Sequence, residues 1–492
     1  MLTPLTQTAD HFVHSSQLHS IAGKSVPSRS GAVQNIFDPS TGSALTSVAI
    51  GAEHEVNLAV AAAEAAFPGW AGTSPVERAV ILHRLADAIE KHATDLVQIE
   101  SLDVGKAIVA TEGFDLPFGI ACLRYFADLL QHVALDIPHA LANIEARTHR
   151  APYGVCGFIF PWNFPFNLLL WNIVPAIAAG NTVVIKPSSL TPLSTLFVAR
   201  LAQEAGLPDG VMNVVVGRGA VGQAIAAHPA LKRMSFTGST SVGKQIGTIC
   251  GGNLVPVKLE LGGKGAAVVF DDVDLDATAK RLAEAITFNT GQVCCTATRW
   301  LFHENVYDAL VAKVIAVLSE TRLGPSLDRN TEMGPLASEA HHERVFEHLA
   351  KGRAEGAEDL LAAKSRPPAG FEHGYYMTPS VMTGASDNIC CREEIFGPCA
   401  FVLKFSNESE AIRQVNSLAY GLANSVWSGD LSRANRVAEQ LNAGNNWINA
   451  HNLFAYGLPY RAINQSGLGG GVNSTETLLD YLRPLTIGRP LG

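Results

Sequence analysis

Cys294 is the residue of this sequence best suited to covalent chemistry. It lies in the segment Gly291-Gln292-Val293-Cys294-Cys295, which follows a run of helical periodicity and contains a glycine that interrupts it. A thiolate adds readily to a carbonyl carbon, so a cysteine in such a break is a candidate nucleophile. Most free cysteines pack as small, inert apolar side chains, and the motif alone leaves both interpretations open.

Glu260 is the candidate general base. It stands in the apolar, strand-like segment Lys258-Leu259-Glu260-Leu261-Gly262-Gly263-Lys264. Burial raises the pKa of a carboxyl group toward neutrality, where the group can accept a proton from water. The alternative is a structural ion pair with Lys258 or Lys264, because ion pairs also perturb carboxyl groups.

Two glycine-containing turns could bind a dinucleotide. Gly217-Arg218-Gly219-Ala220-Val221-Gly222 matches GxGxxG, but the acidic residue that should follow to hold the ribose is missing from residues 235–241. We therefore interpret this match as incidental, although the loop can still line a site. Phe236-Thr237-Gly238-Ser239-Thr240-Ser241-Val242-Gly243 follows a strand and begins a helix, so its free backbone N–H groups suit a pyrophosphate. An ordinary Ser/Thr helix cap is the alternative.

Alternating strands and helices must position these residues. The expected strands are 153–160, 182–186, 213–216, 232–236 and 266–270, and the expected helices are 192–205, 220–227, 241–249 and a long one from residue 275. Continuous apolar strands separated by helices predict an α/β fold, in which a doubly wound parallel sheet is covered on both faces. Residues 54–133 have mostly amphipathic helical periodicity.

Composition narrows the classes of function. A chain of 492 residues, 47% hydrophobic and 16% charged, predicts a globular protein of two or three domains. A net charge of −9 without a Lys/Arg run argues against a nucleic-acid partner. The eight cysteines lack the spacing of a metal site, which predicts reduced thiols, no metal and a cytoplasmic protein. Residues 151–185 lack charge, but their prolines and asparagines argue against a membrane span, and the N-terminus does not resemble a signal peptide.

Taken together, these segments resemble those of the aldehyde dehydrogenase superfamily over essentially the whole chain. Six motifs carry the resemblance, in the family's order and at its spacings. They are Phe160-Pro161-Trp162-Asn163-Phe164-Pro165, Ile185-Lys186-Pro187, Phe236-Thr237-Gly238-Ser239-Thr240, Leu259-Glu260-Leu261-Gly262-Gly263-Lys264, Gly291-Gln292-Val293-Cys294 and Glu393-Glu394-Ile395-Phe396-Gly397-Pro398.

The resemblance implies an aldehyde dehydrogenase-like fold of three parts. A Rossmann-type domain for NAD(P) would comprise residues 1–133 and 153–261. An α/β catalytic domain would comprise residues 262–465. A small β oligomerisation extension would comprise residues 134–152 and 466–492, with a strand over Leu479–Ile487. An unpaired projecting β ribbon is a sticky edge, so a homo-oligomer, a dimer or a tetramer, is expected.

The resemblance also implies residue roles. Cys294 would be the nucleophile, Glu260 the base that activates the hydrolytic water, and Asn163 the side-chain donor to the oxyanion. The residues implied for NAD binding, with NADP possible, are Ile159, Phe160, Pro161, Trp162, Lys186, Ser189, Gly219, Gly238, Ser239, Gly243, Leu261, Glu394 and Phe396. The residues implied around the aldehyde are Phe164, Asn167, Trp171, Phe288, Val293, Cys295, Asn452, Phe454 and Tyr460. Because this second group is rich in aromatic residues and has no charge, an apolar or aromatic aldehyde such as phenylacetaldehyde is expected rather than a charged semialdehyde or betaine aldehyde.

Three positions depart from the family pattern. Ser189 replaces a glutamate that chelates the adenosine ribose in many NAD-preferring members, so the choice between NAD and NADP is open. Asn172 and Gly471 replace a lysine and a glutamate thought to carry protons away from the base. We therefore hypothesise that Glu260 exchanges its proton by another route and that deacylation is slow.

Two alternatives to a hydrolytic dehydrogenase remain at the level of sequence. The first is a CoA-acylating aldehyde dehydrogenase, against which the presence of Glu260 argues and for which the lost relay pair argues. The second is a non-catalytic, crystallin-like homologue, against which the joint presence of Cys294, Glu260 and Asn163 argues.

Overall fold

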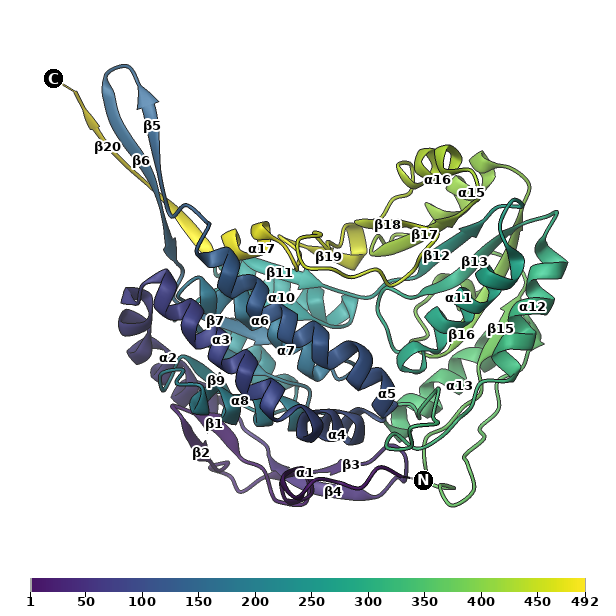
Figure 1. Ribbon diagram of the computed structural model, residues 1–492, viewed down its shortest axis with the longest axis horizontal. Coiled ribbons are helices and arrows are strands. Elements are labelled where there is room, and N and C mark those ends of the chain that lie inside the picture. Colours follow the sequence, from purple (N-terminus) through teal and green to yellow (C-terminus); the bar gives the residue numbers. More distant parts are fainter. Residues whose placement is uncertain (1, 492) are drawn as a thin grey trace.

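Two large sheets form the two lobes of the molecule, and a narrow three-stranded sheet projects from the first lobe (Figure 1). The structure is a computed structural model, and it describes residues 2–491. The N-terminal end lies near the junction of the two lobes, whereas the C-terminal end reaches the tip of the projection.

The first lobe is built on an eight-stranded sheet. In sheet order the strands are β19 (Gly467–Leu468), β11 (Val257–Glu260), β10 (Leu231–Thr237), β7 (Val155–Ile159), β8 (Thr182–Lys186), β9 (Met212–Val214), β1 (His19–Ile21) and β2 (Lys24–Val26). The strands from β11 to β9 are parallel, and β19, β1 and β2 are antiparallel additions at the two edges. The parallel sheet predicted from the alternating pattern is confirmed.

Helices cover both faces of this sheet. α2 (Glu53–Gly72), α9 (Gly219–Ala227) and α10 (Thr240–Gly252) share one apolar core with the sheet. α7 (Pro165–Ala178) and α8 (Leu193–Glu204) lie on the opposite face. Every residue of α7 is buried, because α3 (Pro75–Lys91) and α6 (Leu116–Leu130) cover it from outside. This burial explains why residues 151–185 carry no charge.

The second lobe is built on a seven-stranded sheet. In sheet order the strands are β14 (Glu358–Leu361), β15 (Ser380–Thr383), β16 (Cys399–Phe405), β13 (Ala297–His303), β12 (Gly265–Val269), β17 (Ala423–Trp427) and β18 (Asn445–Ile448). All neighbouring pairs are parallel except β14 and β15. The helices on one face are α11 (Leu275–Thr287) and α12 (Tyr307–Ser319), and those on the other are α13 (Glu339–Ala354), α15 (Glu408–Val415) and α16 (Leu431–Ala438).

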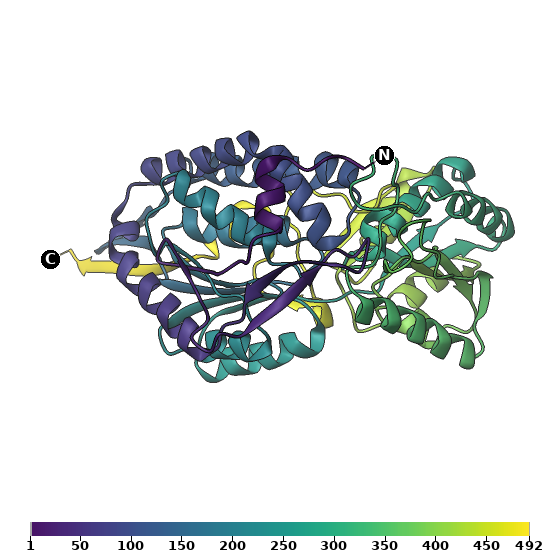
Figure 2. The same cartoon turned by 90° about the horizontal axis from the view of Figure 1, so that it is seen from below.

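The projecting arm consists of the hairpin β5 (Asp136–Leu141) and β6 (Ile144–Pro152) with β20 (Leu482–Pro490) (Figures 1 and 2). β20 is antiparallel to β6 over its whole length, and all of it beyond Leu482 is exposed. The segment 466–492 does not lie entirely in the arm, because β19 pairs with β11 of the first sheet.

Shorter elements complete the two lobes. They are α1 (Gln7–Val13), β3 (Val33–Phe37), β4 (Ala44–Ala49), α4 (Ala93–Val104), α5 (Ile108–Ala110), the π-helix η1 (Thr111–Asp115), the 3-10 helix η2 (Phe288–Gly291), α14 (Ile389–Arg392), η3 (Asn464–Ser466) and α17 (Thr475–Leu479). Among residues 2–491 no helix combines the length and the apolar character needed to cross a bilayer.

Candidate active site

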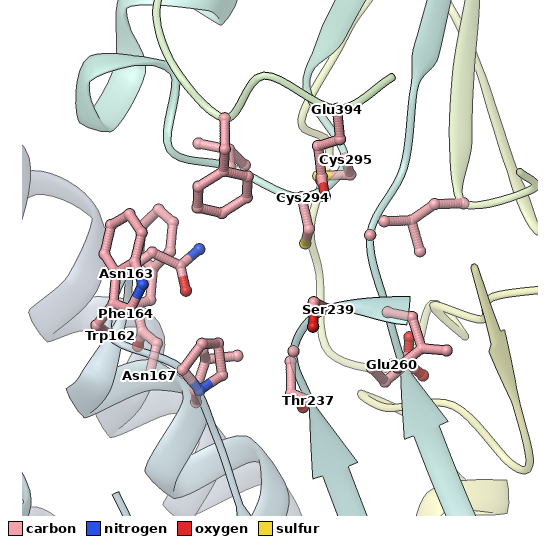
Figure 3. Close-up of a pocket in the computed structure, with 18 of the residues that line it drawn as sticks. Trp162, Asn163, Phe164, Asn167, Thr237, Ser239, Glu260, Cys294, Cys295 and Glu394 are labelled. Atoms are coloured by element: carbon pink, nitrogen blue, oxygen red, sulfur yellow. The ribbon is translucent and has the colours of Figure 1, made fainter. Parts of the chain in front are cut away.

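A cavity of about 580 Å³ lies beside the carboxyl ends of β10 and β11, with walls from both lobes. Ligands of open α/β sheets bind at such strand ends. The structure brings most of the predicted site residues to this cavity: Pro161, Trp162, Asn163, Phe164, Asn167, Trp171, Gly238, Ser239, Glu260, Leu261, Phe288, Val293, Cys294, Cys295, Glu394, Phe396, Phe454 and Tyr460. Figure 3 shows Asn163 and Phe164 facing Cys294 across the cavity, and Glu260 at the end of its strand.

The Cys294 segment has an unusual backbone. Asn289, Thr290 and Gly291 have φ values of 47°, 55° and 68°, so three consecutive residues are left-handed where η2 ends. A Cβ at Gly291 would lie 2.3 Å from the Gly397 carbonyl carbon, so only glycine fits there. Strain of this kind is sustained by surrounding structure and is typical of functional sites. Hydrogen bonding with the Cys295 thiol, followed by burial, raises the pKa of Cys294 well above its usual range.

Asn163 is held in place by the strained segment. Its side-chain nitrogen Nδ2 donates to the Gln292 backbone carbonyl at 3.0 Å, and the backbone carbonyl of Asn163 accepts from Asn289 Nδ2 at 2.8 Å. A carboxamide carries two N–H groups, so the second N–H of Asn163 remains for another acceptor. The side chain is 3% exposed, so such a bond would form in a water-poor environment, where it is strong.

Glu260 ends β11 and is 6% exposed. Burial raises the pKa of this carboxyl group to about 7, although the charge of Lys258 lowers it in part. Across residues 2–491 the carboxyl oxygen Oε2 has no hydrogen-bond partner, and neither Lys258 nor Lys264 forms an ion pair with Glu260. The geometry therefore favours a carboxyl group free to exchange protons over a structural ion pair.

The turn between β10 and α10 has the features of an anion site. Ser239 is the N-cap of α10, yet within the described part of the chain its side chain does not cap the first-turn N–H groups. Its hydroxyl group lies 3.3 Å from that of Ser241 instead. Gly238 and Ser239 both line the cavity, so the uncapped helix end faces open space rather than packed protein. This observation fits the pyrophosphate of a dinucleotide and argues against an ordinary Ser/Thr cap.

Glu394, Phe396 and Trp162 form the neighbouring wall. Phe396 has a φ of 63°, which is rare for an aromatic residue, and His341 Nε2 contacts its carbonyl oxygen at 2.7 Å. Its ring lies edge-on to Trp162 with centroids 5.4 Å apart. The Glu394 carboxylate accepts from the Gly263 N–H at 3.1 Å, and burial raises its pKa to about 7.

The remaining predicted residues lie outside the cavity wall: Ile159, Phe160, Lys186, Ser189, Gly219, Gly243 and Asn452. Ile159 and Lys186 approach the glycine Gly222 of α9, where a Cβ would lie 3.1 Å from the Ile159 side chain. Lys186 Nζ donates to the Pro187 carbonyl at 2.9 Å, and the Ser189 carbonyl accepts from Gln34 at 2.7 Å.

Gly243 and Asn452 have packing roles in the structure. A Cβ at Gly243 would lie 2.3 Å from Leu261, so the glycine lets α10 approach the end of β11. Asn452 has a φ of 57°, and its Oδ1 accepts from the Cys295 thiol at 3.5 Å. Asn452 thus lies behind Cys295 and supports the cavity wall from outside.

One side of the cavity is aromatic. The ring centroids of Phe454 and Tyr460 lie 5.6 Å apart, and those of Trp171 and Tyr460 lie 5.9 Å apart. Phe114 of η1 packs edge-on against Phe288 at 5.3 Å. Such contacts fix the rings and leave a shaped, apolar space between them.

Several wall residues were not predicted: Phe114, Phe118, Leu168, Thr237, Gly262, Arg344, His348, Glu393, Ile395 and Leu422. Phe114 and Phe118 are four residues apart, which is the spacing of one helix face, but that pattern is also typical of an ordinary core helix. Phe114 lies in the π-helix η1 and Phe118 in α6, which follows it directly, and a π-helix has no recognised signal in the sequence.

Comparisons with known proteins agree with one another. A model of the Aldehyde dehydrogenase family matches residues 26–487. A betaine aldehyde dehydrogenase of Mesorhizobium japonicum is 39% identical over 94% of this chain and 93% of its own length. A phenylacetaldehyde dehydrogenase of Pseudomonas fluorescens is 38% identical over 91% of each chain. The solved NAD+ complex of an aldehyde dehydrogenase from Bacillus cereus superposes with a TM-score of 0.97, at 33% identity and 100% coverage of both chains.

Proposed function

The chain belongs to the aldehyde dehydrogenase family and is an NAD(P)-dependent enzyme, and from this premise we propose that it oxidises a neutral aromatic aldehyde to its acid through a thioester on Cys294. The observation that carries the proposal is that Cys294, Asn163 and an unpaired Glu260 share one cavity.

The proposed reaction begins when the Cys294 thiol loses its proton to water and the resulting thiolate sulfur adds to the aldehyde carbon. The oxyanion that forms accepts from the second N–H of Asn163 and from the backbone N–H of Cys294. NAD+, when bound, supplies the acceptor for the hydride that leaves the same carbon. The carbon remains on sulfur as a thioester. Glu260 then removes a proton from water, the resulting hydroxide attacks the acyl carbon, and the C–S bond breaks to release the acid.

NAD+ would bind along the side of the cavity formed by Gly238, Ser239, Trp162, Glu394 and Phe396. The uncapped N-terminus of α10 suits the pyrophosphate. The Glu394 carboxylate suits the hydroxyl groups of a ribose, because an anion accepts hydrogen bonds from them. Ser189 is small and neutral and would tolerate either a hydroxyl group or a phosphate on the adenosine ribose, so both cofactors belong in the assay.

The aromatic side of the cavity supports an aromatic substrate. The rings of Phe114, Phe288, Phe454 and Tyr460 line this part of the wall, whereas the charged residues of the wall come from β11, α13 and residues 393–394. An unpaired carboxylate or ammonium group on the substrate would lose its hydration among these rings at high cost. Lys106 lies 4.0 Å from the ring centroid of Phe164, but it is behind the wall and paired with Asp115 at 2.9 Å.

Polar atoms among these rings refine the substrate class. Asn167 Oδ1, Trp171 Nε1 and the Tyr460 hydroxyl are buried, and each lacks a hydrogen-bond partner within residues 2–491. Asn167 Nδ2 donates to the Asp115 carboxylate at 2.8 Å, which fixes the amide so that its oxygen remains an acceptor. Unpartnered buried polar atoms are costly, and a hydroxyl group on the aromatic ring of a substrate would satisfy them. We therefore expect hydroxyphenylacetaldehyde to be at least as good a substrate as phenylacetaldehyde.

The test is reduction of NAD+ or NADP+ with both aldehydes, with and without CoA, for the wild type and Cys294→Ala. The proposal expects CoA-independent reduction that the variant lacks. A requirement for CoA would identify an acylating enzyme instead. Succinate semialdehyde with a higher kcat/KM than either aryl aldehyde would contradict the substrate class. No reduction with any aldehyde in the panel would contradict the proposal as a whole.

A further inference from the structure

Glu260, as the proposed base, must lose one proton in every turnover, although its carboxyl group is almost fully buried. The two positions at which the family pattern predicts a proton relay cannot titrate. Two hydrogen bonds hold Asn172: its Nδ2 donates to the Leu168 carbonyl at 2.7 Å, and its Oδ1 accepts from the Ser235 hydroxyl at 2.9 Å. Gly471 offers only backbone atoms. The proton therefore needs a different exit.

Lys258 lies beside Glu260 on the same strand. Residues two apart in a strand point to the same face, so the side chains of Lys258 and Glu260 share one face of β11. Lys258 is 0% exposed, and its Nζ lies 3.5 Å from the Gly471 carbonyl, to which it donates. The amino group of Lys258 thus lies next to Gly471, where the glutamate of the expected relay is missing.

A strip of polar side chains runs from this pair toward solvent. β10 pairs with β11 so that Ser235 is opposite Lys258 and Thr237 is opposite Glu260. Arg233, two residues further along the same face, forms an ion pair with Asp480. The Asp480 side chain is 25% exposed, whereas that of Arg233 is 4% exposed, so the strip begins at the cavity and ends at the surface.

We propose that Lys258 is the positioning residue that carries the proton of Glu260 away from the cavity, toward the surface at Asp480. The inference rests on the proposed role of Glu260. The O–H bond of the Glu260 carboxylic acid breaks, and its proton binds the neutral amine of Lys258 to give a carboxylate and an ammonium. The ammonium then loses a proton to water at the Asp480 end. The two groups form no direct ion pair among the described residues, so one water or a rotation of the Glu260 carboxyl group bridges them.

The charges around the pair suit such a transfer. Burial lowers the pKa of Lys258, which Glu260 and Asp480 raise in part and Arg233 lowers. Burial raises the pKa of Glu260. The two groups therefore approach each other in proton affinity, so transfer of a proton between them is not strongly uphill in either direction. The other titratable groups near Glu260 are Cys294 and Tyr460, and the pKa values of both lie well above the usual range.

Two substitutions at Lys258 test the inference in the full-length enzyme. Lys258→Met removes the charge, and Lys258→Arg keeps a charge that cannot accept a proton. Rapid-mixing assays measure the first NADH formed per active site separately from the steady-state rate. Lys232→Met is the matched control, because Lys232 is an exposed lysine of β10. Thermal unfolding is measured for every variant.

Both Lys258 variants should form the first NADH at a rate within about twofold of the wild type and then turn over about tenfold or more slowly than the wild type, so that the burst of NADH stands out more clearly from the steady state. The pH at which kcat is half-maximal should rise in Lys258→Met, because the cation no longer stabilises the carboxylate, and should stay near the wild-type value in Lys258→Arg. Unchanged steady-state rates, or an equal loss of the first NADH and of turnover, would overturn the inference. Full turnover in Glu260→Gln would instead show that the proposed base is wrong.

Discussion

Replacement of Asn163 by alanine tests the proposed role of its side chain as the oxyanion donor, provided that the side chain contributes little to folding stability. That contribution to stability is small. The variant loses the bond from Nδ2 to the Gln292 carbonyl, but that carbonyl also accepts from Asn289 Nδ2 at 3.4 Å, and the bond from Asn289 to the Asn163 backbone oxygen remains. One internal hydrogen bond contributes about 0.5–1.5 kcal/mol, so the free energy of unfolding should fall by about 1 kcal/mol.

The expected catalytic loss is larger. Removal of one preorganised donor to an oxyanion costs about 10²–10³ in rate, which corresponds to roughly 2.7–4 kcal/mol. The assay is the rate of the first NADH formed after rapid mixing with phenylacetaldehyde, beside urea unfolding and alkylation of Cys294 by iodoacetamide. Alkylation should remain within about threefold of the wild type, because no oxyanion forms in that reaction. A first-turnover rate within fivefold of the wild type, in a folded protein, would refute the assignment of Asn163.

Three further predictions concern the base, the aromatic wall and the arm. Because burial raises the pKa of Glu260 to about 7, and a base must be deprotonated, kcat should fall as the pH drops through about 7. This acidic fall in kcat should vanish in Glu260→Gln and persist in Glu394→Gln. Its persistence in Glu260→Gln would contradict the role of Glu260. Phe114→Ala should lower kcat/KM for phenylacetaldehyde by about tenfold, through the lost ring contact and packing, and leave acetaldehyde nearly unchanged; equal losses for both aldehydes would point to general damage. Leu485 and Ile487 are 37% and 48% exposed on the arm, so the wild type should be an oligomer in light scattering and the double substitution to Asp should give a smaller particle; a monomeric wild type would exclude this role.

Local patterns in the sequence predicted the scaffold well. The strands 153–160 and 182–186 have continuous apolar character because they are central and parallel, and the structure contains them as β7 and β8. The C-terminal segment was predicted less accurately. The prediction placed residues 466–492 together in the arm, whereas β19 adds to the first sheet, because the pairing of a two-residue strand depends on tertiary contacts.

The site was predictable where one short motif contains both the functional residue and the backbone turn that positions it. Gly291 and Cys294 are such a case, because the left-handed turn and the thiol lie within one segment. Phe114 and Phe118 were not predictable, since Phe114 lies in a π-helix and Phe118 in the helix that follows it, and helical spacing alone does not distinguish a cavity wall from a core. Lys258 was visible in the sequence only as a possible ion-pair partner of Glu260. Its contact with the Gly471 carbonyl joins residues 213 positions apart and emerges only from the fold.

The most direct test of the central claim is to trap the acyl group on the enzyme. Glu260→Gln should still form the thioester but hydrolyse it slowly, so the protein quenched in acid after incubation with phenylacetaldehyde and NAD+ is digested and its peptides are weighed by mass spectrometry. The account predicts one acyl group on Cys294, none on Cys295, and none anywhere in Cys294→Ala. NADH formation without an acylated Cys294, or acylation of Cys295 in its place, would contradict it.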